Sequence, residues 1–122
     1  MSTKLTIGYS TLFERLQNIT PPAERPDWET VVVVQNPNKT PWNPSDFPKL
    51  RDRGDVRFEE LDLVGVAKSR TRVIWLAGSE YLVFADDDIV FSESGLDEAI
   101  SYLDQNPKLS LLLAQAQAPS GK

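Results

Sequence analysis

The order of apolar and polar residues predicts two strands in the first third of the chain. Residues 4–10 alternate apolar side chains with smaller or polar ones, which is typical of a strand. Residues 31–34 are four consecutive valines, and valine favours extended backbone. A continuous apolar run of this length indicates a strand that is covered on both faces, as in a parallel sheet.

A helix is predicted between these two strands. Residues 11–14 match the pattern of a capping box, in which a Thr side chain and a Glu three positions later satisfy free backbone groups at a helix start. Leu12, Leu16 and Ile19 fall on one helical face. The helix must end before the two prolines at 21–22, because proline cannot continue a helix.

The rest of the chain alternates predicted loops, strands and helices. Residues 36–55 hold four prolines and are predicted to be a loop, with Trp42 and Phe47 as anchors onto the body. The further predicted elements are strands at 56–61, 80–85 and 109–113, a helix at 65–77, and a helix from a capping box at 94–97 to about residue 105. Strands that alternate with helices indicate an α/β fold, with a Rossmann-like, mostly parallel sheet and helices on both faces.

Length and composition place the chain in the globular class. Its 122 residues suffice for one domain, residues 1–122, and 40% hydrophobic with 25% charged residues is ordinary globular usage. The net charge of −5 argues against a basic surface that binds nucleic acid. No apolar run approaches the roughly 18 residues of a membrane span, so we expect a cytoplasmic protein with no transmembrane segment.

The residue types that the chain lacks restrict its chemistry. There is no Cys and no His, so disulfides, thiolate ligands and imidazole bases are excluded. Any bound metal must therefore be held by oxygen atoms. Oxygen ligands suit hard cations such as Mg²⁺ or Mn²⁺, which bind through one or two carboxylates together with substrate phosphates.

An acidic run follows the predicted strand at 80–85 directly and consists of Asp86, Asp87 and Asp88. In open α/β sheets, ligands bind beyond the carboxyl ends of the strands. Three adjacent carboxylates at such a point repel one another unless a cation is bound. The run therefore predicts a metal and nucleotide site, and the alternative is a solvated acidic turn.

The predicted helix at 65–77 places Arg70 in the middle of an apolar face. That face consists of Val66, Val73, Ile74 and Ala77. We expect Arg70 to be buried beside a carboxylate or a diphosphate, so that its removal costs about 3 kcal/mol or more. The alternative is a structural salt bridge with one of the acidic residues. Lys68 lies on the solvent side with Arg72, where it can reach a phosphate or simply favour solubility.

Two other predicted strand ends carry polar groups that could contact a base. Tyr9, Ser10 and Thr11 end the first strand, and Gln35 and Asn36 follow the valine run. The Tyr9 ring could stack on a base, or it could simply pack in the core. The two amides could read a base edge, or they could cap the turn before the next proline.

Two segments in combination resemble the GT-A-fold glycosyltransferases, especially the family-2-like group. These are residues 65–72 (GVAKSRTR) and 80–88 (EYLVFADDD). That family shares an Ala-x-x-Arg-type helix and a following strand that ends in an Asp-x-Asp (DXD) motif. The resemblance covers nearly the whole chain, as the N-terminal part of such an enzyme.

The resemblance implies that the chain binds a nucleoside-diphosphate sugar, with a UDP-sugar as the expected partner. It implies that Asp86 faces the ribose or orients the site, and that Asp88, with Asp86, holds the Mn²⁺ or Mg²⁺ that bridges the diphosphate. The residues assigned to the nucleotide-sugar site in this way are Tyr9, Ser10, Thr11, Gln35, Asn36, Lys68, Arg70, Asp86 and Asp87.

The resemblance also implies a missing half, because the family's acceptor-binding part and general base follow the DXD motif by many residues. The chain is therefore expected to be shortened after the DXD region, and neither Glu93, Glu98 nor Asp104 matches the base. The apolar stretch at 109–113 would then be exposed and pair two copies in a homodimer. The alternative is a non-catalytic Rossmann-like module that binds a nucleotide or a protein partner.

Overall fold

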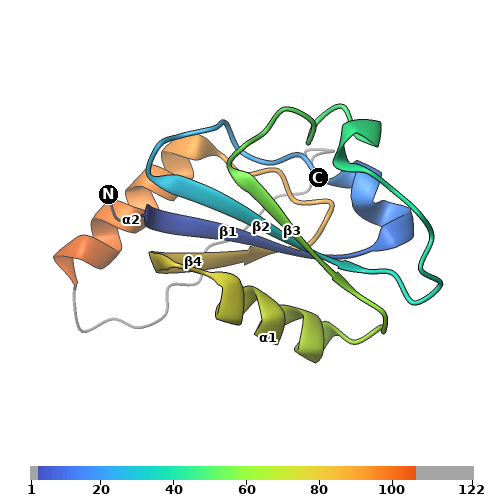
Figure 1. Cartoon of the computed structure of the whole chain (residues 1–122). Coiled ribbons are helices and arrows are strands. Elements are labelled where there is room, and N and C mark those ends of the chain that lie inside the picture. Colours follow the sequence, from blue (N-terminus) through green and yellow to red (C-terminus); the bar gives the residue numbers. More distant parts are fainter. Residues whose placement is uncertain (1–2, 107–122) are drawn as a thin grey trace.

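The computed structural model describes residues 3–106, which contain one four-stranded sheet (Figure 1). The strands are β1 (Thr3–Leu12), β2 (Trp28–Gln35), β3 (Val56–Leu61) and β4 (Ser79–Ala85). The helices are α1 (Val66–Leu76) and α2 (Glu93–Gln105), with two short 3-10 helices, η1 (Phe13–Asn18) and η2 (Pro44–Asp46). The strand predicted at 109–113, and the homodimer contact assigned to it, lie outside the described residues.

All four strands pair in parallel, in the order β3-β2-β1-β4. The predicted α/β class with a Rossmann-like parallel sheet is therefore confirmed. All four valines of the run at 31–34 are fully buried, because β2 lies inside the sheet and both of its faces are covered. The chain passes from β1 to β2 on one side and later returns to place β4 on the other side of β1. The order of the strands therefore reverses between β1 and β4.

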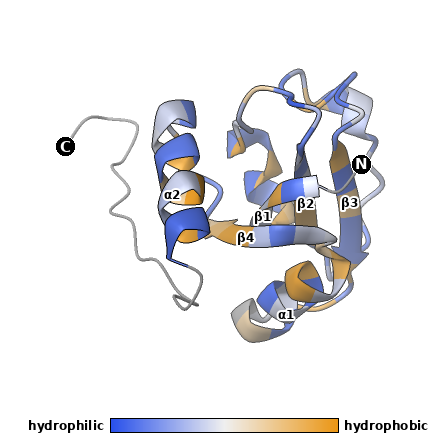
Figure 2. Cartoon of the chain, turned by 90° about the vertical axis from the view of Figure 1, so that its left-hand side faces the viewer, coloured by the Kyte–Doolittle hydropathy of each residue, from blue (hydrophilic) through white to orange (hydrophobic). Residues whose placement is uncertain are grey.

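Two apolar cores lie on opposite faces of the sheet. On one face, Val31 and Val33 pack against Val73 of α1. The alternate side chains of β2 belong to a larger core, which includes Leu16 of η1 and Leu96 of α2. Figure 2 shows α1 below the strands and α2 beside β4. The prediction of helices on both faces is thus confirmed. In the described part of the chain, neither helix has the length and apolarity that a membrane span requires.

The long loop between β2 and β3 is anchored by aromatic side chains, as predicted. The ring of Trp42 lies 6.1 Å from that of Phe47 and 5.4 Å from that of Phe58 of β3. Trp42 Nε1 also donates a hydrogen bond to Glu60 at 2.6 Å. These contacts hold the loop against the larger core, although it has little regular structure.

Two of the predicted helix starts are wrong. The capping box at 11–14 does not form, because Thr11 belongs to β1 and η1 is a 3-10 helix of 6 residues without a side-chain cap. Helix α2 begins at Glu93, and its N-cap is Ser92 instead of Ser94. In both regions the apolar pattern located the segment correctly, but the first start failed because β1 extends through Leu12, and at α2 two nearby hydroxyl side chains could have served as the cap.

Candidate functional site

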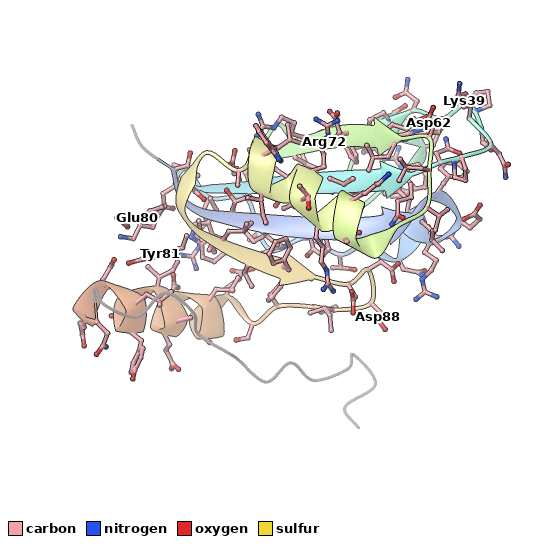
Figure 3. The ribbon with its side chains drawn as sticks, turned by 90° about the horizontal axis from the view of Figure 1, so that it is seen from below. Lys39, Asp62, Arg72, Glu80, Tyr81 and Asp88 are labelled. Carbon is pink, nitrogen blue, oxygen red and sulfur yellow. The ribbon has the colours of Figure 1, made fainter. Side chains whose placement is uncertain are left out.

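The carboxyl ends of β1 and β4 meet where the strand order reverses, which is the place where parallel sheets bind ligands. The paired part of these two strands ends at Tyr9 and Ala85. Beyond this pair, β4 leads into residues 86–88. Figure 3 shows Asp88 at this end of β4 and Glu80 at the opposite end. The topology thus places the acidic run at the predicted edge of the sheet.

The middle carboxylate of the run points into the protein. Asp87 is 7% exposed, and both of its oxygens accept hydrogen bonds from Arg15. Arg15 Nε donates at 3.0 and 2.9 Å, and Arg15 Nη2 donates at 2.9 Å. Thr11 Oγ1 donates a further bond at 2.9 Å. These bonds with Asp87 raise the pKa of Arg15 above its ordinary value. Asp87 is therefore a buried carboxylate that is paired with Arg15 at the carboxyl end of the sheet.

The two flanking carboxylates face solvent. The Asp86 side chain is 71% exposed, and its Oδ1 lies 3.8 Å from Arg70 Nη2. Asp88 is also exposed. The three carboxylates therefore do not point to one place. Among residues 3–106, no group of three or more His, Cys, Asp or Glu side chains is arranged to hold a metal ion. A cation at this edge would have at most two protein carboxylates from the acidic run.

The prediction that Arg70 is buried is wrong, because its side chain is 50% exposed. Helix α1 turns Ser69 and Val73 toward the sheet, and both are fully buried, whereas Ile74 is 56% exposed. The packing face is thus rotated away from the one that apolar residues alone indicated. Ser69 can be buried because its hydroxyl is bonded to Ser10. A polar residue therefore belongs to the packing face, and Arg70 is left at the surface.

Ser10 and Gln35 are brought together with the first turns of α1. Ser10 Oγ donates to Ser69 Oγ, and Gln35 Nε2 donates to Ser10 Oγ at 3.4 Å. Gln35 Oε1 accepts a bond from the backbone N–H of Gly65 at 2.7 Å. Gln35 is 4% exposed, so these bonds use its amide within the protein. The network fixes the ends of β1 and β2 against α1, next to the acidic run.

Tyr9 and Asn36 have the packing and turn-capping roles that were the alternatives to base contacts. Tyr9 is fully buried, its hydroxyl donates to Thr20 O at 3.3 Å, and burial raises its pKa. Asn36 donates to Thr40 O at 2.9 Å and accepts from Thr40 N at 3.2 Å. Neither side chain presents exposed surface at the edge of the sheet.

Lys68 lines a groove between α1 and the end of β3. The groove has a volume of about 510 Å³ and is lined by Leu61, Leu63, Ala67, Lys68, Thr71, Arg72 and Trp75. Trp75 is 79% exposed, and Figure 3 shows Arg72 on the same helix. Residues 86–88 do not line this groove, so Lys68 and the acidic run border different parts of the surface.

Arg15 and Ser69 also belong to this edge, although the sequence did not predict either of them. The signal for Ser69 was its spacing, because it lies one turn before Val73 on the helix. Arg15 had no comparable signal. Its partner, Asp87, is 72 positions away, and only the pairing of β1 with β4 brings the two together.

The solved structures that resemble this fold include those of S. aureus TarS, a glycosyltransferase. The crystal structure of TarS 1–349 gives a TM-score of 0.62 at 21% identity and covers 84% of this chain and 33% of that chain. The same fragment in complex with UDP-GlcNAc gives a TM-score of 0.61 at 21% identity, over 84% of this chain and 32% of that chain.

These comparisons show the fold of the chain. The chain spans about a third of the TarS fragment. No protein-family model and no curated protein sequence matches it.

Proposed function

We propose that this chain is the donor-binding part of a glycosyltransferase and binds a nucleoside-diphosphate sugar, a UDP-sugar first of all, together with a divalent cation. Two observations support this proposal. The fold resembles TarS, which was crystallised with UDP-GlcNAc. The exposed carboxylates Asp86 and Asp88 lie where the strand order reverses. Transfer of the sugar to an acceptor hydroxyl is proposed for the whole enzyme.

The groups at this edge fit Mn²⁺ or Mg²⁺. Asp86 and Asp88 offer carboxylate oxygens, and the chain has no thiol or imidazole that would favour a softer metal. Hard divalent cations commonly use one or two carboxylates and complete their coordination with phosphate oxygens and water. A cation at this position would neutralise the charge that develops on the leaving diphosphate.

The side chains around these carboxylates would orient the nucleotide. We assign Asp88, with Asp86, to the cation and Asp86 also to the ribose side. Arg70 is half-exposed and only 3.8 Å from Asp86, so its guanidinium can turn to a diphosphate oxygen. Ser10 is half-buried, while Thr11 and Gln35 are buried. The nucleoside would therefore contact Ser10 and the backbone of this edge.

Calorimetric titration with UDP, GDP and ADP tests the proposal, each in Mn²⁺ and in excess chelator. We expect UDP to bind in Mn²⁺ and to lose its affinity in chelator, because carboxylates without a cation repel a diphosphate. Asp88→Asn should bind at least about tenfold more weakly, by analogy with other changes at metal sites. Asp62→Asn, an exposed carboxylate after β3 with 67% side-chain exposure, is the matched control and should bind like wild type.

Two results would count against the proposal. Equal nucleotide affinity with and without chelator would show that binding does not require a cation. Absence of binding by all three nucleotides would overturn the donor-binding function and favour a non-catalytic module.

A further inference from the structure

We propose that Arg15 and Asp87 form a positioning pair, which fixes the direction of Asp86 and Asp88 and does not itself contact the ligand. The effect on nucleotide binding rests on the proposed function. The direction of the carboxylates does not, because it is a property of the chain alone. In this role Asp87 does not contact the nucleotide sugar, although the family resemblance implied that it would.

The contacts of Asp87 leave it little capacity for a ligand. It is 7% exposed, and its two oxygens accept three bonds from Arg15 and one from Thr11. A carboxylate with this many charge-assisted and neutral bonds is held in a single orientation. A cation that used Asp87 would have to displace the guanidinium of Arg15.

The position of the pair explains how it directs its neighbours. Ala85 is buried, Asp86 is exposed, Asp87 is buried and Asp88 is exposed, so the chain alternates its side chains inward and outward. The backbone N–H of Ile89 donates to Asp86 O at 3.2 Å and closes a turn around the run. When Asp87 is fixed inward within this turn, its two neighbours must point outward.

The hydrogen-bond partners of Asp87 belong to β1 and to the segment after it, which lie across the point where the strand order reverses. Thr11 is in β1 and Arg15 is in η1, whereas Asp87 follows β4. The pair therefore joins the two strand ends beyond the point where their own pairing stops at Tyr9 and Ala85. The positive charge of Arg15 also attracts the charges of Asp86 and Asp88, which reduces the mutual repulsion of the three carboxylates.

A second Arg–Asp pair provides a matched control. Arg53 Nε and Nη2 donate to the two oxygens of Asp55 at 2.8 and 2.7 Å, and the side chains are 18% and 9% exposed. Asp55 directly precedes β3, so this pair lies at the amino end of the sheet, away from residues 86–88. Arg53→Gln should lower stability without changing the acidic run.

The first experiment tests only the direction of the three Asp side chains. Carboxylates of the full chain are labelled with a carbodiimide and the labelled residues are identified by mass spectrometry. In wild type we expect Asp86 and Asp88 to be labelled and Asp87 to be protected. In Arg15→Gln, Asp87 should become labelled at least about tenfold faster, whereas Arg53→Gln should keep the wild-type pattern. Asp87 labelled as fast as Asp86 in wild type, or unchanged protection in Arg15→Gln, would overturn the pair.

The second experiment measures Mn²⁺-dependent UDP affinity at a temperature where every variant is folded by circular dichroism. Arg15→Gln should bind about 10 to 100-fold more weakly, as changes to the support of metal ligands do. Arg15→Lys keeps the charge and has a single donor nitrogen in place of the Nε and Nη2 of arginine, so it should recover part of the loss. A purely structural role predicts equal losses in Arg15→Gln and Arg53→Gln, and that result would refute the positioning role.

The two experiments separate the failure of the pair from the failure of the proposed function. If wild type does not bind Mn²⁺ and UDP, the proposed function fails, and the labelling pattern still decides the orientation. If wild type binds and Arg15→Gln binds equally well, the positioning role fails while the proposed function stands.

Discussion

Substitution of Gly8 by Ala should weaken the fold by forcing α1 away from β1. A Cβ at Gly8 would lie closer than 3.0 Å to Val73 Cγ1 and 3.5 Å from Leu82 Cδ1, and real Cβ atoms essentially never come within 3.0 Å of a heavy atom outside their own and the adjacent residues. Val73 cannot swing aside easily, because a β-branched side chain in a helix has one preferred rotamer. Overpacking of this kind costs about 1–3 kcal/mol of unfolding free energy. The stiffer unfolded chain returns only about 0.4–1 kcal/mol.

A double-mutant cycle isolates this contact. Val73→Ala alone removes two methyl groups, at about 0.8 kcal/mol each plus a cavity term, so we expect a loss of about 2 kcal/mol. In the double variant the methyl group introduced at position 8 occupies part of that cavity. Its loss should be smaller than the sum of the two single losses by about 1 kcal/mol or more. Gly54→Ala is the control, because nothing lies within 4 Å of a Cβ at that position.

Urea unfolding monitored by circular dichroism gives the free energy and the m value of each variant. The m values should stay constant, since the surface exposed on unfolding hardly changes. If Gly8→Ala were as stable as Gly54→Ala, or if the two single losses simply added, α1 would not be packed on β1 through this glycine.

Two further predictions concern charged surface groups. Arg70→Ala should change the unfolding free energy by no more than about 1 kcal/mol, because its ion pair is exposed, and a loss of about 3 kcal/mol would restore the buried Arg70 that the sequence suggested. Asp97 has a pKa below its ordinary value of 3.8, chiefly because Arg25 donates hydrogen bonds to it. It therefore stabilises the fold above about pH 3.8, and this contribution is lost as the pH falls through the lowered pKa. In thermal melts from about pH 6 to pH 2, the melting temperature of Asp97→Asn should fall less steeply with decreasing pH than that of the wild type. An unchanged pH dependence would refute this assignment.

Most of the fold was predictable from the sequence because the sheet depends on local apolar patterns. The valine run at 31–34 could hardly be anything other than an interior strand, and the strands at 56–61 and 80–85 were placed within a residue of their ends. Helix starts were less predictable. At the start of α2, both Ser92 and Ser94 could cap the helix, and the choice between them depends on tertiary contacts.

The candidate site was only partly predictable, because side-chain direction depends on partners that are distant in sequence. The location of the acidic run at a strand end followed from the order of the elements. The inward turn of Asp87 did not, since it depends on Arg15 in η1. The face of α1 was misjudged for a similar reason. A helical wheel considers only the positions of apolar residues along the helix. It does not include the hydrogen bond from Ser10 that makes burial of Ser69 favourable.

The strand order also has a consequence for the time course of folding. Side chains that join β1 to β2, such as Thr6 and Glu29, are 23 positions apart, whereas Thr11 and Asp87 are 76 positions apart. Closing the longer loop costs more chain entropy, and contacts of large sequence separation form slowly. We therefore expect the first three strands to associate before β4 docks. The acidic edge is then the last part of the sheet to be assembled, so a signal that depends on Asp86 and Asp88 reports completed folding of the entire sheet.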